Sequence, residues 1–136
     1  MAEPRRWVLA AEATLWLVIA GLGLRLATFA RLAAAAGRPL SRRRPDDGGV
    51  DAARIAWAVD AVSRRAPWTP LCFERGLAAH FMLRRRGLDS TLFYGARNDD
   101  VLGPSAHVWV SLDGRAVIGG EEAPRFALLA RFPERR

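Results

Sequence analysis

The sequence has no lysine and only one cysteine, and both scarcities restrict the chemistry that the protein can perform. A single cysteine excludes a disulfide within the chain and a zinc site made of several thiolates. It also fits a reducing compartment, so we expect a cytoplasmic protein. We expect neither a metal nor a cofactor.

Because lysine is absent, the net charge of +7 comes entirely from arginine. The arginines are spread along the chain, and aromatic residues do not alternate with them as they would on a platform for single-stranded nucleic acid. We therefore expect no nucleic acid as a partner. The 136 residues are enough for one domain with a modest core.

The N-terminal stretch from Trp7 to Leu32 is strongly apolar. Its longest charge-free run, Ala13 to Leu24, has about a dozen residues, whereas a membrane-spanning helix needs about 20. Glu12 and Arg25 bracket this run. We predict one or two helices that pack on the rest of the domain or on a partner protein. Membrane contact is not expected, and association with a membrane surface is the lesser alternative.

An exposed linker is predicted from Ala33 to Gly49, where glycine and proline interrupt any helix and three consecutive arginines form a solvated charge run. Helical periodicity then resumes from Val50 to Ala66, with the apolar residues on one face. Pro67 ends this second helical stretch.

The only cysteine, Cys72, stands where another helix is predicted to begin. Thr69 suits the N-cap and Pro70 the first helical position, and Gly87 suits the C-terminal end after Arg86. Cys72 then lies in the first turn, where free N–H groups and the helix dipole favour a thiolate and lower its pKa. The alternative is a small buried side chain without a chemical role.

After Gly87 the pattern changes from helix to strand. Asp113-Gly114 is a strong hairpin signal, and the preceding strand alternates between an apolar face and a face with His107 and Trp109. The expected elements are a strand at 90–96, a polar loop at 97–104, strands at 105–112 and 115–119, and a short helix or packed tail at 126–132.

The chain has two histidines as candidate bases for the cysteine. His80 follows Cys72 by eight residues on the same helix, about 12 Å further along its axis, and does not meet the thiol. His107 lies on a strand that helix–sheet packing can bring to the start of the cysteine helix. A cysteine at a helix start followed by a strand histidine is typical of papain-like and transglutaminase-like enzymes. The alternative is an ordinary half-buried strand residue.

An ordered series of motifs carries a resemblance to a known family: Cys72-Phe73-Glu74-Arg75-Gly76-Leu77-Ala78, Met82 to Gly87, Leu92-Phe93-Tyr94-Gly95, Ala106-His107-Val108-Trp109-Val110, and Asp113-Gly114. The series resembles the transglutaminase-like leader peptidases of lasso-peptide biosynthesis, from about Ile55 to Phe132. The resemblance implies an α+β, papain/transglutaminase-like fold in which N-terminal helices and a small antiparallel sheet pack on the cysteine helix. Residues 1–49 would supply the apolar helices and the linker, and residues 50–136 the cysteine peptidase core of a single domain.

The resemblance also implies a function: a cysteine peptidase that removes the leader from a ribosomally made precursor peptide through a thioester. It implies three partners, namely the precursor peptide, a separate leader-recognition protein and a lasso cyclase. The residues alone support only a cysteine nucleophile of unknown substrate. The alternatives are a non-enzymatic adaptor with this fold, or an amidase or transglutaminase that acts on another acyl substrate.

The resemblance also implies a third catalytic residue, which would orient the histidine. The family leads us to expect an aspartate after the turn, but residues 117–122 contain none. We choose Glu121, with Asp113 as the alternative, although a turn aspartate is explained by the hairpin itself. A backbone carbonyl or a water in place of a carboxylate is the remaining option.

Overall fold

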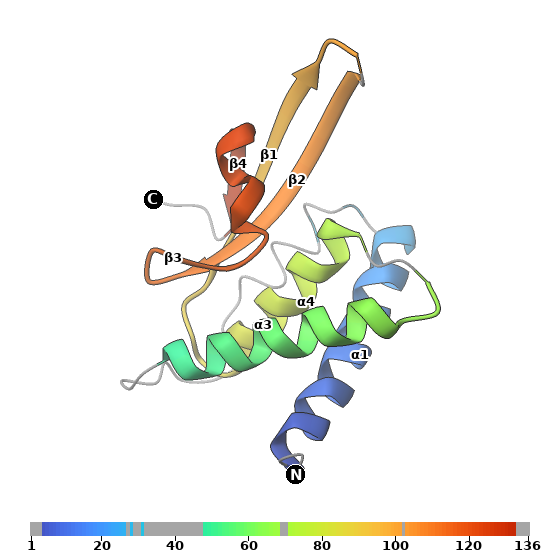
Figure 1. Ribbon diagram of the computed structural model, residues 1–136, viewed down its shortest axis with the longest axis vertical. Helices are drawn as coiled ribbons and strands as arrows, with labels where there is room; N and C mark the ends of the chain where they lie inside the picture. The colour runs from blue at the N-terminus through green and yellow to red at the C-terminus, as the bar shows by residue number, and fades with distance from the viewer. Residues whose placement is uncertain are drawn as a thin grey trace.

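The computed structural model describes residues 4–26, 28, 31, 48–68, 71–101 and 103–132. This part of the chain forms an α+β fold in which helices pack on a four-stranded antiparallel sheet (Figure 1). The elements are α1 (Pro4–Leu26), α3 (Gly48–Arg65), α4 (Cys72–Arg85), β1 (Thr91–Asp99), β2 (Gly103–Leu112), β3 (Arg115–Ile118), the 3-10 helix η1 (Gly120–Arg125) and β4 (Ala127–Phe132).

The strands lie in the order β3-β2-β1-β4. Asp113 and Gly114 both have positive φ, at 51° and 79°, as a two-residue hairpin turn between β2 and β3 requires, so the predicted turn is confirmed. A polar loop was predicted at 97–104, and this range is wrong because most of it is strand. Arg97 pairs with Ser105 and Asp99 with Gly103, so both strands continue far into it, and their far end projects beyond the helices (Figure 1).

The C-terminal segment was expected as a helix or a packed tail, and this expectation is wrong. Residues 127–132 form β4, which pairs antiparallel with β1 from Leu92↔Phe132 to Ala96↔Ala127. A short apolar run does not distinguish helix from strand by its periodicity. The free edge of β1 decides the outcome, because pairing there satisfies the backbone groups of both strands.

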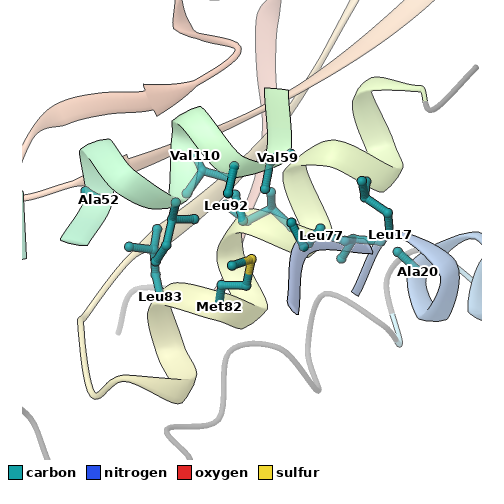
Figure 2. Packing of buried hydrophobic residues seen from close by; sticks show 14 of the residues in the cluster. Leu17, Ala20, Ala52, Val59, Leu77, Met82, Leu83, Leu92 and Val110 are labelled. Atoms are coloured by element: carbon teal, nitrogen blue, oxygen red, sulfur yellow. The ribbon is translucent and has the colours of Figure 1, made fainter. Parts of the chain in front are cut away.

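The core lies between the helices and the sheet, with α4 at its centre. Leu77 and Met82 of α4 are fully buried, and Leu17 of α1, Val59 of α3 and Leu92 of β1 belong to the same cluster (Figure 2). These buried side chains come from four elements and form one contiguous cluster, as expected for a single hydrophobic core. The packing of an N-terminal helix on the rest of the fold is therefore observed.

Helix α1 is also fixed to α4 by polar contacts. The Glu12 carboxylate accepts hydrogen bonds from Arg86, at 2.5 and 3.0 Å, and from Arg85 at 3.3 Å. Burial raises the pKa of Glu12, but the hydrogen bond and charge of Arg86 and the charge of Arg85 hold it below its usual value. Trp16 stacks on Phe81 with ring centroids 4.7 Å apart. These contacts determine which side of α1 faces the core.

The opposite side of α1 carries large apolar side chains that are exposed to solvent. Val8 is 65% exposed, Leu15 56%, Leu22 55% and Leu26 87%. By length and composition, the stretch Trp7–Leu26 is able to span a membrane, with a mean hydropathy of 1.8. A core helix or a signal sequence can meet the same criteria, so the stretch by itself is weak evidence for a span.

His80 is fully buried in the core, where its Nδ1 lies 2.7 Å from the Ser90 hydroxyl. Burial, and then the charge of Arg84, lower the pKa of this imidazole from 6.5 to about 3. The folded protein therefore keeps His80 neutral at pH values where an unfolded chain binds a proton. Stability must fall as the pH decreases through this interval, because the unfolded state gains the proton first.

We expect the free energy of unfolding to fall by about 1 to 2 kcal/mol between pH 6.5 and pH 5 through His80 alone. The measurement is urea unfolding at the two pH values for the wild type and for His80→Asn. The carboxylates titrate in both proteins, so the difference between the two pH dependences isolates His80. An identical pH dependence in both proteins would contradict the expectation.

Candidate active site

Cys72 is the first residue of α4. The N-cap is Leu71, with extended backbone at φ −86° and ψ 168° and no side-chain capping bond. Thr69 and Pro70, predicted as the cap and the first helical residue, lie outside the described residues, and the helix begins at Cys72 instead. The placement of Cys72 in the first turn agrees with the prediction. Gly87 ends the helix as expected, at φ 77° and with its N–H donated to the Arg84 carbonyl.

The absence of a side chain at Gly76 lets α4 lie directly on β2. A Cβ built at Gly76 would be 2.6 Å from Cγ1 of Val108, closer than carbon atoms approach without displacement. Gly76 is buried one helical turn after Cys72. The cysteine is thereby held beside the segment of β2 that carries His107.

The environment of the Cys72 thiol contradicts the predicted direction of its pKa shift. Burial raises the pKa, and this effect exceeds the opposing hydrogen bonds from the backbone of Val108, Phe73 and Cys72 and the charge of Arg75. The N–H groups at the helix start lower the pKa, but the loss of water around the sulfur outweighs them. The resting side chain is a neutral thiol at neutral pH, so a base must remove its proton before the sulfur can react.

The ring of His107 is held in place by its neighbours. Its Nε2 lies 2.8 Å from the Gly119 carbonyl oxygen, and its side chain is 8% exposed. A carbonyl only accepts hydrogen bonds, so Nε2 carries the hydrogen and Nδ1 keeps the free lone pair. The rings of Trp109 and Phe126 stack on the imidazole with centroids 5.9 and 5.2 Å away. The ring is fixed, and its basic nitrogen is Nδ1.

Cys72 and His107 line one cavity of about 600 Å³, so the structure brings the two predicted residues to the same site. The cavity lies where β3 ends, between α3, α4 and η1. It is polar at several points, and Arg75 donates a hydrogen bond to Asp60 across 3.2 Å at its wall. His80 is buried in the core and is not among the lining residues, in agreement with the sequence argument.

Glu121 and Asp113 occupy different places relative to this cavity. Glu121 is exposed in η1 and lines the cavity, as does its neighbour Glu122. Asp113 is exposed in the hairpin turn and does not line it. The hydrogen bond of the His107 ring goes to the Gly119 carbonyl, which corresponds to the backbone option considered from the sequence. A catalytic role of Glu121 stays a prediction.

Gly119 is the functional residue that the sequence argument missed. It adopts φ 77°, and a Cβ there would lie 2.8 Å from the Val108 carbonyl oxygen and 3.3 Å from Nε2 of His107. Only glycine fits this left-handed turn so close to the imidazole. The available signal was the Gly119-Gly120 pair directly after a strand, which is typical of a sharp change in chain direction.

We expect Gly119→Ala to lower the free energy of unfolding by about 1 to 3 kcal/mol and to displace the acceptor of His107. Gly114→Ala is the matched control, because Gly114 also has positive φ, at 79°, but nothing within 4 Å of the built Cβ. Both variants should lose stability in urea unfolding. Only Gly119→Ala should change the ring ¹⁵N and Nε2–H resonances of His107. Unchanged resonances in Gly119→Ala would contradict the expectation.

Comparison with known proteins adds the family. The family model described as transglutaminase-like superfamily matches residues 14–131, which is most of the chain. Neither a curated protein nor a solved structure gives a significant match. The match includes both Cys72 and His107 and agrees with the helices and the antiparallel sheet observed here. The chain belongs to the transglutaminase-like superfamily and has its α+β, papain/transglutaminase-like fold.

Proposed function

We propose that this protein is a cytoplasmic cysteine peptidase that removes the leader from a ribosomally made lasso-precursor peptide. The observation that carries the proposal is the shared cavity of Cys72 and His107, with Nδ1 of the histidine left basic by the Gly119 carbonyl. The superfamily supports cysteine-based acyl chemistry in general. The leader-peptide substrate rests on the resemblance of the sequence motifs.

In the proposed mechanism, Nδ1 of His107 removes the thiol proton as the sulfur of Cys72 attacks the scissile carbonyl carbon. The resulting oxyanion is stabilised by the backbone N–H of Cys72 at the start of α4. The imidazolium gives its proton to the leaving amine of the core peptide, and the C–N bond breaks to leave a thioester on the leader. His107 then deprotonates a water whose oxygen attacks the thioester carbonyl carbon, the C–S bond breaks to release the leader acid, and the departing sulfur takes the proton back from His107.

Glu121 is proposed as an electrostatic partner of the imidazolium that forms in this sequence of steps. Its acidic side chain lines the cavity from η1, and a carboxylate there favours the protonated histidine. Glu122→Gln is the matched control, because both glutamates are exposed and line the same cavity. We expect a loss of a few fold in turnover for Glu121→Gln that exceeds any loss for Glu122→Gln. Equal pH–rate profiles for the wild type and Glu121→Gln would exclude this role.

We further propose that leader recognition resides in a separate protein, which docks on the exposed face of α1. This face, which we call the α1 outer face, consists of Trp7, Val8, Leu15, Leu22 and Leu26. An exposed apolar surface of this kind is typical of an interaction site. Trp16 does not belong to this face, because its ring packs on Phe81 within the fold. A separate lasso cyclase would use the core peptide whose amine is freed.

The experiment that tests the proposed function combines the purified chain with a lasso-precursor peptide, with and without its leader-recognition protein. Leader and core are identified by their masses. We expect cleavage at the leader–core junction, with the partner strongly increasing its rate. Full-rate, leader-selective cleavage by this chain alone would contradict the two-component proposal. No cleavage under either condition would contradict the peptidase.

The competing function is a non-enzymatic adaptor, or an amidase or transglutaminase that passes the acyl group to another acceptor. Rapid alkylation at neutral pH does not separate these classes, because burial raises the pKa of Cys72 and slow labelling is expected for either. The separating measurement is the fate of the acyl group. Water as the acceptor supports a peptidase or amidase, an amine supports a transglutaminase, and no turnover supports the adaptor.

A further inference from the structure

An apolar groove of about 510 Å³ adjoins the catalytic cavity. It lies between α1, α3 and the segment that follows α3. Trp57 lines both the groove and the catalytic cavity, so the two hollows meet at this side chain. The groove residues are Trp7, Ala10, Thr14, Trp57, Ala61, Val62, Arg65, Ala66, Pro67 and Trp68.

The groove and the cavity differ in chemistry. Among the described residues that line the groove, Arg65 alone is charged, whereas the cavity wall includes Asp60, Arg75 and Glu121. Three tryptophans contribute to the groove and keep part of their surface exposed: Trp7 at 70%, Trp57 at 40% and Trp68 at 37%. Rigid aromatic side chains around a hollow of a few hundred Å³ are typical of a site for an apolar group.

The wall of the groove is tied to the helix that carries the nucleophile. The indole N–H of Trp68 donates a hydrogen bond of 3.3 Å to the carboxylate of Glu74, two residues after Cys72 on α4. A group held against Trp68 therefore has a defined position relative to the sulfur. When a substrate side chain binds beside the reacting atoms, it fixes the position of the scissile bond and so raises the rate of acyl transfer.

We propose that this groove, the tryptophan groove, holds a bulky apolar side chain from the acyl side of the peptide substrate. The inference rests on the proposed function, because the acyl side of the scissile bond is then the leader. The leader-recognition protein is proposed to dock on α1, and α1 contributes Trp7, Ala10 and Thr14 to the groove. A leader delivered from α1 passes this groove before it reaches Cys72.

The test uses peptidyl chloromethyl ketones, in which the Cys72 sulfur displaces chloride and forms a thioether. The probes are acetyl-Xaa-Ala-Gly and acetyl-Ala-Xaa-Gly chloromethyl ketones with Phe, Leu, Ala or Asp at Xaa. Labelling of the full-length protein is followed by mass spectrometry. We expect Phe or Leu in one of the two positions to label Cys72 at least about 10-fold faster than Ala or Asp, the ratio typical of filling an apolar pocket.

Two variants change the groove in opposite ways. Trp68→Ala removes a wall, and Thr14→Trp fills the hollow from an exposed position on α1. Both should reduce the preference for Phe or Leu to less than about 3-fold. The rate with iodoacetamide is measured for each variant and corrects for any change in the reactivity of the thiol itself. Leu129→Ala is the control, because it shortens an apolar side chain that is 63% exposed on β4 and lies outside the groove. Circular dichroism confirms that each variant is folded.

The outcomes separate this inference from the proposed function. The tryptophan groove would be overturned if the wild type showed no preference for Phe or Leu, or if the preference survived in both groove variants. Neither result bears on leader release, which the cleavage assay tests. A preference that both variants abolish supports the groove even where the precursor is not cleaved, and the missing cleavage then counts against the leader-peptidase proposal alone.

Discussion

Cys72→Ala is expected to abolish leader release, lowering turnover by at least about 10⁴-fold, because a thioester needs a thiol and Cys72 is the only cysteine of the sequence. The change removes one sulfur atom from a half-buried position, so the free energy of unfolding should change by less than about 1 kcal/mol. The measurement is release of leader acid from the precursor in the presence of the partner protein. Urea unfolding of the same preparation shows that loss of activity is not loss of fold.

Cys72→Ser provides a second version of this test. It keeps the shape of the side chain and a hydroxyl that His107 must deprotonate, but oxygen at this position is a much weaker nucleophile than sulfur. It should also be inactive. Leader release by well-folded Cys72→Ala protein would exclude Cys72 as the nucleophile and would favour the adaptor, with the activity coming from another protein in the preparation.

His107→Ala is expected to lower turnover by about 10²- to 10⁴-fold, since it removes both the base that activates the thiol and the acid that protonates the leaving amine. The residual activity should rise with pH. Burial raises the pKa of Cys72, so without the base the thiolate fraction is small at pH 7 and grows about tenfold per pH unit until that pKa is reached. The measurement is the pH–rate profile from pH 6 to pH 10.

The matched control is His80→Asn, because His80 is the only other histidine and is buried away from the cavity. At pH 7 this variant should keep most of the turnover, while its unfolding changes as described above. A His107→Ala protein with wild-type turnover at pH 7 would show that another group accepts the thiol proton.

The sequence predicted those features that depend on strong local signals. Helix α3 and most of α4 follow from apolar periodicity and from the stop at Gly87, and the turn of Asp113 and Gly114 follows from the dipeptide itself. Cys72 and His107 were predicted to lie together because packing of the helix on the sheet can bring the helix start, with its cysteine, next to the strand that carries the histidine. The shared cavity agrees with this inference.

The features that were missed depend on contacts between distant segments. The strand at 127–132 exists because β1 has a free edge, and no pattern within those six residues contains that information. The direction of the Cys72 pKa shift depends on burial by the surrounding fold, which the helix start alone does not reveal. The acceptor of His107 is the main-chain oxygen of Gly119, and its position depends on the left-handed turn at φ 77° after β3, which no side-chain type in the sequence marks as an acceptor.

The acceptor of His107 is a peptide carbonyl, and this has a consequence for how such sites are recognised across genomes. A carboxylate partner is encoded by one codon, whereas the oxygen of Gly119 belongs to the main chain and is present whatever residue stands there. What the sequence must specify is the path of the chain, through a residue that tolerates φ 77°. A search for a side chain that accepts the hydrogen bond of the histidine misses a protein built this way, and a glycine after the third strand is the feature to look for in its relatives.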